Sequence, residues 1–180
     1  MDYIERGTKS YKQTALAFFA AGFNTFAILY VVQPILPDLT EYYGVTPTAA
    51  SLSLSVTTFT LAISMLIFGS ISEAVGRKNI MIVSMLTASV LCILTAFSPT
   101  FGSLIVMRAL QGVALAGLPS IAMAYLGEEI HPRSLPGAMG LYISGNALGA
   151  VFGRVLAGVT AGLWGWQYGL IGVGIVSLIA

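Results

Sequence analysis

The stretch Gly69–Lys78, which reads GSISEAVGRK, is a short charged island between two long apolar runs. No Asp, Glu, Lys or Arg occurs from Tyr42 to Ser72, and the next charge after the island is Arg108. A cationic loop between two runs long enough to cross a bilayer is typical of a tight turn on the positively charged face of a membrane. The sequence therefore predicts two membrane helices that are joined by this loop.

The composition favours the same class of protein. The 180 residues are 57% hydrophobic and 8% charged, whereas soluble domains are about 25% charged. A soluble fold could not cover so much apolar surface, so we expect an all-α polytopic membrane protein. The net charge of +1 gives no indication of nucleic-acid binding. The single cysteine, Cys92, excludes an intramolecular disulfide and a cysteine-rich metal site, and no cofactor is expected.

Six apolar segments are expected to be membrane helices, and the first is too long to be the core of a cleaved signal. Prolines, Gly and charged residues separate the segments, and Asp38 and Glu41 are expected in a loop after the first of them. The last segment is still apolar at Ala180, as a helix cut short or barely complete would be. The expected spans are residues 14–34, 47–71, 79–97, 101–126, 136–159 and 166–180.

The cations outside these spans indicate an orientation. With six spans they all fall on one side of the membrane: Arg6, Lys9, Lys12, Arg77, Lys78 and Arg133. The loops on the opposite side contain neither Lys nor Arg. The positive-inside rule then predicts a cytoplasmic amino terminus, with Asp38 and Glu41 outside.

The island also resembles a known motif. Its pattern is carried by Gly69, Ser72, Glu73, Gly76, Arg77 and Lys78. It is similar to the cytoplasmic loop between the second and third helices of major facilitator superfamily transporters, roughly Gly-x-Leu-Ala-Asp-Arg-x-Gly-Arg-Lys. Glu73 stands where Asp is usual and Ala74 where Arg is usual. The resemblance implies a loop that latches the two halves of the carrier on the inner side, with Glu73 able to pair with its neighbouring cations.

Arg108 is expected inside the fourth span, where a cation usually faces a bundle interior or a wet cavity. It shares a helical row with Gly112, Ala116 and Ser120, which are small residues typical of close packing or a cavity wall. The pattern Arg108-x-x-Gln111-Gly112 resembles the fourth-helix motif of major facilitator drug:proton antiporters. That resemblance implies a role in proton coupling or substrate response. The alternative is a structural Arg that snorkels outward or ties helices together through backbone carbonyls.

The fifth span has small residues on a four-residue step, which predicts close helix contact: Gly137, Gly145, Gly149, Gly153, Ala157 and Ala161. Residues 145–154 resemble the antiporter signature Gly-x-x-x-Gly-Pro-x-x-Gly-Gly. Ala150 replaces the proline and Arg154 replaces the last glycine, so we expect a straighter helix and a weaker likeness to antiporters. Arg154 has two equal interpretations: snorkelling to the outer surface, or a gate or substrate contact.

Asn24 lies in the middle of the first span and requires a hydrogen-bond partner, which either another helix or a ligand can supply. Weaker candidates for substrate contact are Tyr30, Gln33, Tyr142 and Asn146. No Asp or Glu occurs within an expected span. Either the coupling carboxylate lies in another part of the protein, or transport is not proton-coupled through this part.

The resemblance covers almost the whole chain. It implies the amino-terminal six-helix half of a twelve-helix secondary carrier in the bacterial cytoplasmic membrane, with a cavity between the halves for a small-molecule substrate. The missing carboxy-terminal half and membrane lipid are then its partners. We expect efflux of a small organic solute by alternating access, with proton antiport in the full-length protein. A sugar or metabolite carrier of the same superfamily and a non-transporting interaction protein or remnant are the alternatives. An enzyme is not expected, because no nucleophile–base pair, metal cluster or phosphate loop is recognisable.

Overall fold

The chain folds into a bundle of helices, and the computed structural model describes residues 3–179 apart from the side chains of residues 71 and 73–75. The expected all-helical fold class is confirmed. Over the described residues the helices are α1 (Lys9–Tyr30), α2 (Leu36–Tyr43), α3 (Pro47–Val75), α4 (Arg77–Thr95), α5 (Phe101–Leu115), α6 (Pro119–Glu129), α7 (Leu135–Trp164) and α8 (Trp166–Ile179). By length and composition, α1, α3, α4, the α5–α6 pair and α7 can each cross a membrane, and α8 is a shorter apolar helix.

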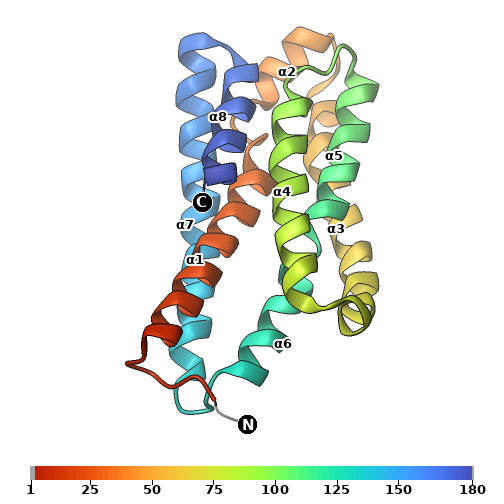
Figure 1. Ribbon diagram of the computed structural model, residues 1–180. Helices are drawn as coiled ribbons and strands as arrows, with labels where there is room; N and C mark the ends of the chain where they lie inside the picture. Colours follow the sequence, from red (N-terminus) through yellow and green to blue (C-terminus); the bar gives the residue numbers. More distant parts are fainter. Residues whose placement is uncertain (1–2, 180) are drawn as a thin grey trace.

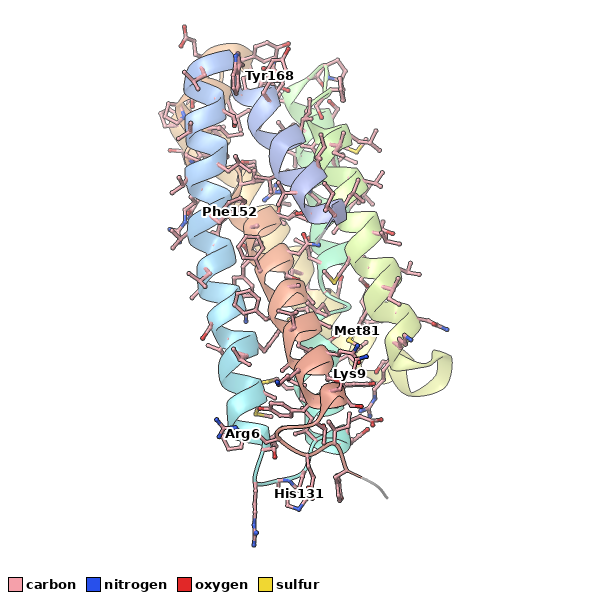
Figure 2. The ribbon with its side chains drawn as sticks, turned by 60° about the vertical axis from the view of Figure 1, so that its left-hand side comes forward. Arg6, Lys9, Met81, His131, Phe152 and Tyr168 are labelled. Atoms are coloured by element: carbon pink, nitrogen blue, oxygen red, sulfur yellow. The ribbon has the colours of Figure 1, made fainter. Side chains whose placement is uncertain are left out.

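The bundle has two chemically different ends (Figure 1). The amino-terminal segment, the α3–α4 turn and the α6–α7 loop lie at the lower end, which we call the cationic end. It carries the six cations that the sequence groups together, and Arg6 and His131 mark it in Figure 2. The short helix α2, the α4–α5 turn and the α7–α8 turn lie at the upper end, which we call the α2 end and which Tyr168 marks in Figure 2.

Local signals in the sequence explain where several helices begin. The hydroxyls of Thr8, Thr46 and Thr100 cap α1, α3 and α5 by accepting from the backbone N–H three residues on, each at 3.2 Å. Ser103 completes a capping box with Thr100. Between α3 and α4 the chain turns at Gly76, whose φ of 97° is a conformation that side chains with a Cβ rarely adopt.

The first span differs from the sequence expectation. α1 begins at Lys9 and ends at Tyr30, and residues 36–43 form α2, so Asp38 and Glu41 lie on a short helix and the predicted loop is wrong. Pro37 occupies the first turn of α2, where its missing N–H leaves no helical hydrogen bond unmade. Leu39 on α2 is completely buried, which holds this helix across the end of the bundle.

The fourth expected span lies within residues 101–129, which can cross a membrane as one stretch, but the structure divides it into two helices. α5 ends at Leu115 and α6 begins at Pro119. A proline ring clashes with the carbonyl four residues before it, so Pro119 can begin a helix but not continue one. In the interval, Gly117 lies against Ser84 of α4, so closely that a Cβ would overlap the Ser84 hydroxyl.

Two apolar clusters form the core. One surrounds Ile28, Leu104 and Leu170 towards the α2 end, and the other surrounds Phe18 and Leu126 towards the cationic end. Outside the core, many large apolar side chains of the spans are exposed, such as Leu66 at 79%. Such an exterior is typical of a surface covered by lipid or by another part of a membrane protein.

Candidate functional site

The guanidinium of Arg108 on α5 lies in the centre of the bundle and is 0% exposed. Its Nε donates to the Ser53 carbonyl on α3 at 3.2 Å. Nη1 donates to the carbonyl of Ile28 at 3.3 Å and to Oε1 of Gln111 at 2.6 Å, and Nη2 donates to the carbonyl of Leu29 at 2.9 Å. The side chain therefore joins three helices through backbone carbonyls.

The carbonyls of Ile28 and Leu29 can accept from Arg108 because they lie where α1 ends. Ile28 and Leu29 lie in its last turn, where carbonyl oxygens lack the usual partners four residues on. The carboxy-terminal end of a helix also carries the negative end of the helix dipole, which attracts a cation. Among the described residues no carboxylate contacts Arg108, so backbone carbonyls of α1 and α3 and one side-chain amide solvate the charge. This geometry matches the structural alternative for Arg108, and its role in coupling or substrate response remains a prediction.

Gln111 extends the network to a fourth helix. It is completely buried, and its Nε2 donates to the Ala88 carbonyl of α4 at 3.5 Å. One residue on, Gly112 faces α3, where a Cβ would overlap the Thr60 hydroxyl and the Thr57 carbonyl. The Thr60 hydroxyl also donates to the Ala109 carbonyl at 3.0 Å. The motif on α5 thus brings α1, α3, α4 and α5 into contact.

Asn24 lies apart from this network. It is 2% exposed, and its Nδ2 donates to the Ser177 carbonyl of α8 at 3.0 Å, while its Oδ1 has no partner among the described residues. Cys92 of α4 makes a similar link to α8, from its thiol to the Leu170 carbonyl at 3.4 Å. Asn24 therefore connects α1 to α8 and does not meet Arg108.

Three glycines of α7 lie against the backbone of α1, at positions where a Cβ would overlap a main-chain carbonyl. The pairs are Gly145 with Phe19, Gly149 with Phe23 and Gly153 with Ala27. The rings of Phe23 and Phe152 also pack together at 5.1 Å, and Figure 2 shows Phe152 part-way along α7. This close contact fixes the register of α7 on α1 and carries the residue after Gly153 towards the end of α1.

That residue is Arg154, which lies beside Tyr30. Its Cζ is 5.2 Å from the centroid of the Tyr30 ring, and its Nε donates to the Ala150 carbonyl at 2.8 Å. Arg154 is exposed, whereas Tyr30 and Gln33 are partly buried. Asn146 lies further down α7, against Gly22 of α1, and its Oδ1 has no partner among the described residues.

The candidates thus fall into separate groups. The structure brings Arg108 together with Gln111, and Arg154 together with Tyr30. Asn24 faces α8, Tyr142 and Asn146 face α1, and Gln33 follows α1 in the turn that leads to α2. All of these groups lie within one helical bundle, and their contact with a substrate remains a prediction.

At the cationic end, Arg77 forms an ion pair with Glu128 at 2.5 Å, which joins the first residue of α4 to the end of α6. The two residues are 51 positions apart in the chain, so the sequence pattern does not reveal their pairing. The side chain of Glu73, which the sequence analysis placed among the cations of the loop, lies outside the described residues. Arg77 is 21% exposed and Glu128 is 63% exposed, so water reaches the pair.

The amino-terminal segment is more ordered than the polar tail that its composition suggests. Ile4 donates to the Glu129 carbonyl at 2.9 Å and accepts from His131 N–H at 3.1 Å, which forms a short parallel bridge to the α6–α7 loop. The Arg6 N–H donates to the Ser134 hydroxyl at 3.0 Å. This strap closes the cationic end next to the Arg77–Glu128 pair.

An apolar groove of about 330 Å³ opens between α1, α4 and α6 at the same end. Its walls include Phe18, Met81, Met85 and Tyr125, with Lys78 as its cation. The described chain shows no cluster of metal-ligating side chains.

Comparisons with known proteins agree with this architecture. The family model for the Major Facilitator Superfamily matches residues 14–180. The chain is 63% identical over its whole length to the uncharacterized MFS-type transporter YybF of Bacillus subtilis, of which it covers 45%. It is 43% identical over 98% of its length to the inner membrane transport protein YnfM of Escherichia coli, covering 42% of that protein. It is 30% identical over 85% of its length to the MFS antiporter QDR3 of Candida albicans, covering 21% of that protein.

A solved structure has the same fold. The chain superposes with a TM-score of 0.78 and 19% identity on a bacterial homolog to the human lysosomal transporter Spinster, in an inward-facing and occupied conformation. The match covers 96% of this chain and 44% of that one. The chain therefore spans less than half the length of the proteins that it matches.

Proposed function

Because the chain belongs to the Major Facilitator Superfamily, a family of membrane transporters and not of enzymes, we propose that it forms the amino-terminal half of a secondary transporter for a small organic solute. The family match over residues 14–180 carries this proposal. The transporter works by alternating access, in which two halves rock about a site between them. The carboxy-terminal half is then the principal partner of this chain, and lipid surrounds both.

The network around Arg108 supports such a mechanism. A half that rocks must keep its helices together, and Arg108 and Gln111 join α1, α3, α4 and α5 by hydrogen bonds. The glycine contacts between α7 and α1 add a fifth helix to the same body. Charge-assisted hydrogen bonds in a medium of low dielectric resist separation, so the half moves as one unit.

We place the cationic end in the cytoplasm of a bacterial cell, with the protein in the inner membrane. The segregation of Lys and Arg supports this orientation. The similarity to YnfM of Escherichia coli, an inner membrane transport protein, supports the choice of membrane. The Arg77–Glu128 pair and the tight turn at Gly76 then form the inner latch of the carrier.

We propose that the transporter exports its solute from the cell and couples this export to the entry of protons. The support for this proposal is the likeness of residues 108–112 and 145–154 to antiporter motifs and the name of the fungal relative. No Asp or Glu is present in α1, α4, α5, α7 or α8, so the coupling carboxylate belongs to the carboxy-terminal half. A sugar or metabolite carrier is the second candidate, because Ala150 stands in place of the antiporter proline.

Transport assays on the full-length protein in proteoliposomes test this function, with ethidium, benzoate and glucose as probes and an imposed pH gradient. We expect uptake of at least one of the first two probes when protons leave the vesicle down their gradient. This uptake should be lost when an uncoupler is added. Transport that is insensitive to the uncoupler contradicts antiport, and transport of glucose alone favours the second candidate. Absence of transport with a wider panel of solutes favours the interaction protein.

A further inference from the structure

Arg154 is a cation well inside the membrane-spanning part of the bundle. α7 ends at Trp164, ten residues after Arg154, which corresponds to about 15 Å at 1.5 Å per residue. The hydrocarbon core of a bilayer is about 30 Å thick. A charged side chain at this depth is costly unless it faces water, a cavity or an opposite charge.

The side chain does not reach for the membrane surface. A snorkelling Arg154 would extend towards Trp164, but its Nε instead donates to the Ala150 carbonyl one turn back along α7, at 2.8 Å. The Tyr30 ring, 5.2 Å from Cζ, holds the guanidinium from a second side. Two neighbours therefore fix the position of this cation on α7, ten residues before the helix ends.

The charge is not neutralised within the described residues. Arg154 makes no ion pair there, and the bond from Nε is the hydrogen bond that its guanidinium makes with the described residues. The four N–H groups of Nη1 and Nη2 thus remain available on an exposed part of α7. A planar guanidinium with free N–H groups matches the two oxygens of a carboxylate or similar oxyanion.

The surroundings of the guanidinium are aromatic. Tyr30 packs against Phe26 at 6.1 Å between ring centroids, and both side chains are only partly buried. Tyr30 lies where α1 meets α7, whereas Asn24 of the same helix turns to α8. A ligand with an anionic group and an apolar body could therefore place the anion against Arg154 and the apolar body against Tyr30.

We propose that Arg154 and Tyr30 form a binding element for the anionic group of the transported solute, so that the substrate class is small organic anions with an apolar body. This inference rests on the proposed transport function and narrows it. A guanidinium at the site repels a cationic solute, so the element selects benzoate over ethidium.

Binding to the purified full-length protein in detergent tests the inference without requiring transport. The probes are two pairs of equal shape and different charge: benzoate with benzamide, and cyclohexanecarboxylate with cyclohexanecarboxamide. We expect each carboxylate to bind at least about tenfold more tightly than its amide, because a charge-assisted hydrogen bond is the difference between them. Titration followed by intrinsic tryptophan fluorescence or thermal shift gives the dissociation constants.

Variants then locate the site. Arg154→Gln should abolish the preference, so that carboxylate and amide bind about equally. Arg154→Lys should retain part of the preference. Tyr30→Leu, which removes the aromatic ring beside the guanidinium, should weaken carboxylate binding. Arg133→Gln, which removes an exposed cation of the α6–α7 loop, is the matched control and should change nothing. Size-exclusion profiles show whether each variant is folded.

Several results would overturn the inference. They are equal binding of acid and amide by the wild type, no carboxylate binding at all, or full carboxylate binding by Arg154→Gln. If the protein transports its solutes with the same KM in wild type and Arg154→Gln, the inference fails and the transport function stands. If carboxylates bind but nothing is transported, the binding element stands and the function fails.

Discussion

Arg108 donates from Nη1 to Oε1 of Gln111, 2.6 Å away and one turn along the same helix. This contact orients the amide, because an Oε1 that accepts from a guanidinium leaves the Nε2 group to point to the Ala88 carbonyl of α4. The arginine and the glutamine therefore act together: Arg108 contacts α1 and α3, and Gln111 contacts α4.

Replacement of Gln111 by Leu should destabilise the protein by about 1–3 kcal/mol, because the buried Arg108 loses an acceptor and the Ala88 carbonyl loses a donor. Unfolding of the purified protein in detergent measures the change. Gln13→Leu, at an exposed position of α1, is the control and should have little effect. Equal stability of the two variants would mean that the buried amide contributes nothing.

Arg108→Lys should retain the charge and still lower both stability and transport. An ammonium group has three donors on one nitrogen, whereas the present donors diverge towards carbonyls of α3 and α1 and towards Gln111. We expect a loss of about 2–4 kcal/mol in unfolding free energy. Wild-type transport by Arg108→Lys would show that charge alone is needed, which would favour a coupling role over the structural one.

Tyr43 allows a test of pH dependence at the α2 end. Its hydroxyl donates to the Ser98 carbonyl at 2.7 Å, and partial burial, with a smaller effect of Tyr42, raises the pKa of Tyr43 from 10.0 to about 12. The folded state thus favours the neutral phenol, so its stabilising effect is complete below pH 10 and is lost as the pH rises towards 12. Tyr43→Phe should lose less stability than the wild type over this interval, as measured by thermal unfolding. If the stability of the two proteins fell in parallel between pH 10 and 12, the raised pKa of Tyr43 would be contradicted.

The sequence predicted the fold class well because the signals are strong: six apolar segments and a one-sided set of cations. It missed the short helix α2 and the break between α5 and α6, and a proline lies at each of these places. Pro37 and Pro119 each lie in the first turn of a helix, but in the sequence they lie within or next to apolar runs. A hydropathy pattern does not distinguish a helix that continues from one that stops and restarts.

The candidate site was predicted less completely than the fold. Arg108, Gln111 and Arg154 are recognisable because polar groups inside apolar runs are few. Their partners are mostly backbone carbonyls, which every residue has, so no pattern of residue types could identify Ile28, Leu29 or Ala150 beforehand. The pairing of Arg77 with Glu128 and the strap at Ile4 depend on which ends of the helices meet, and only the three-dimensional arrangement shows that.

The Arg77–Glu128 pair should contribute little to stability and more to transport. Its partners are partly exposed, and such pairs contribute about 0.2–1 kcal/mol. As part of the inner latch, however, the pair should affect the balance between the two states of the carrier. Arg77→Glu and Glu128→Arg should each slow transport in proteoliposomes, and the double exchange should restore most of the rate. Slow transport by the double variant would show that the residues act separately.

A matched pair of glycines tests the packing of α7 on α1. Gly149 faces the Phe23 carbonyl so closely that a Cβ would overlap it, whereas a Cβ on Gly140 of the same helix meets nothing within 4 Å. Gly149→Ala should force the two helices apart and cost about 2–4 kcal/mol. Gly140→Ala should raise stability by about 0.5–1 kcal/mol, because Ala is the better helix former. Thermal unfolding of both variants measures the difference. If Gly149→Ala were as stable as Gly140→Ala, α1 and α7 would not be in backbone contact, and Arg154 would not be held beside Tyr30.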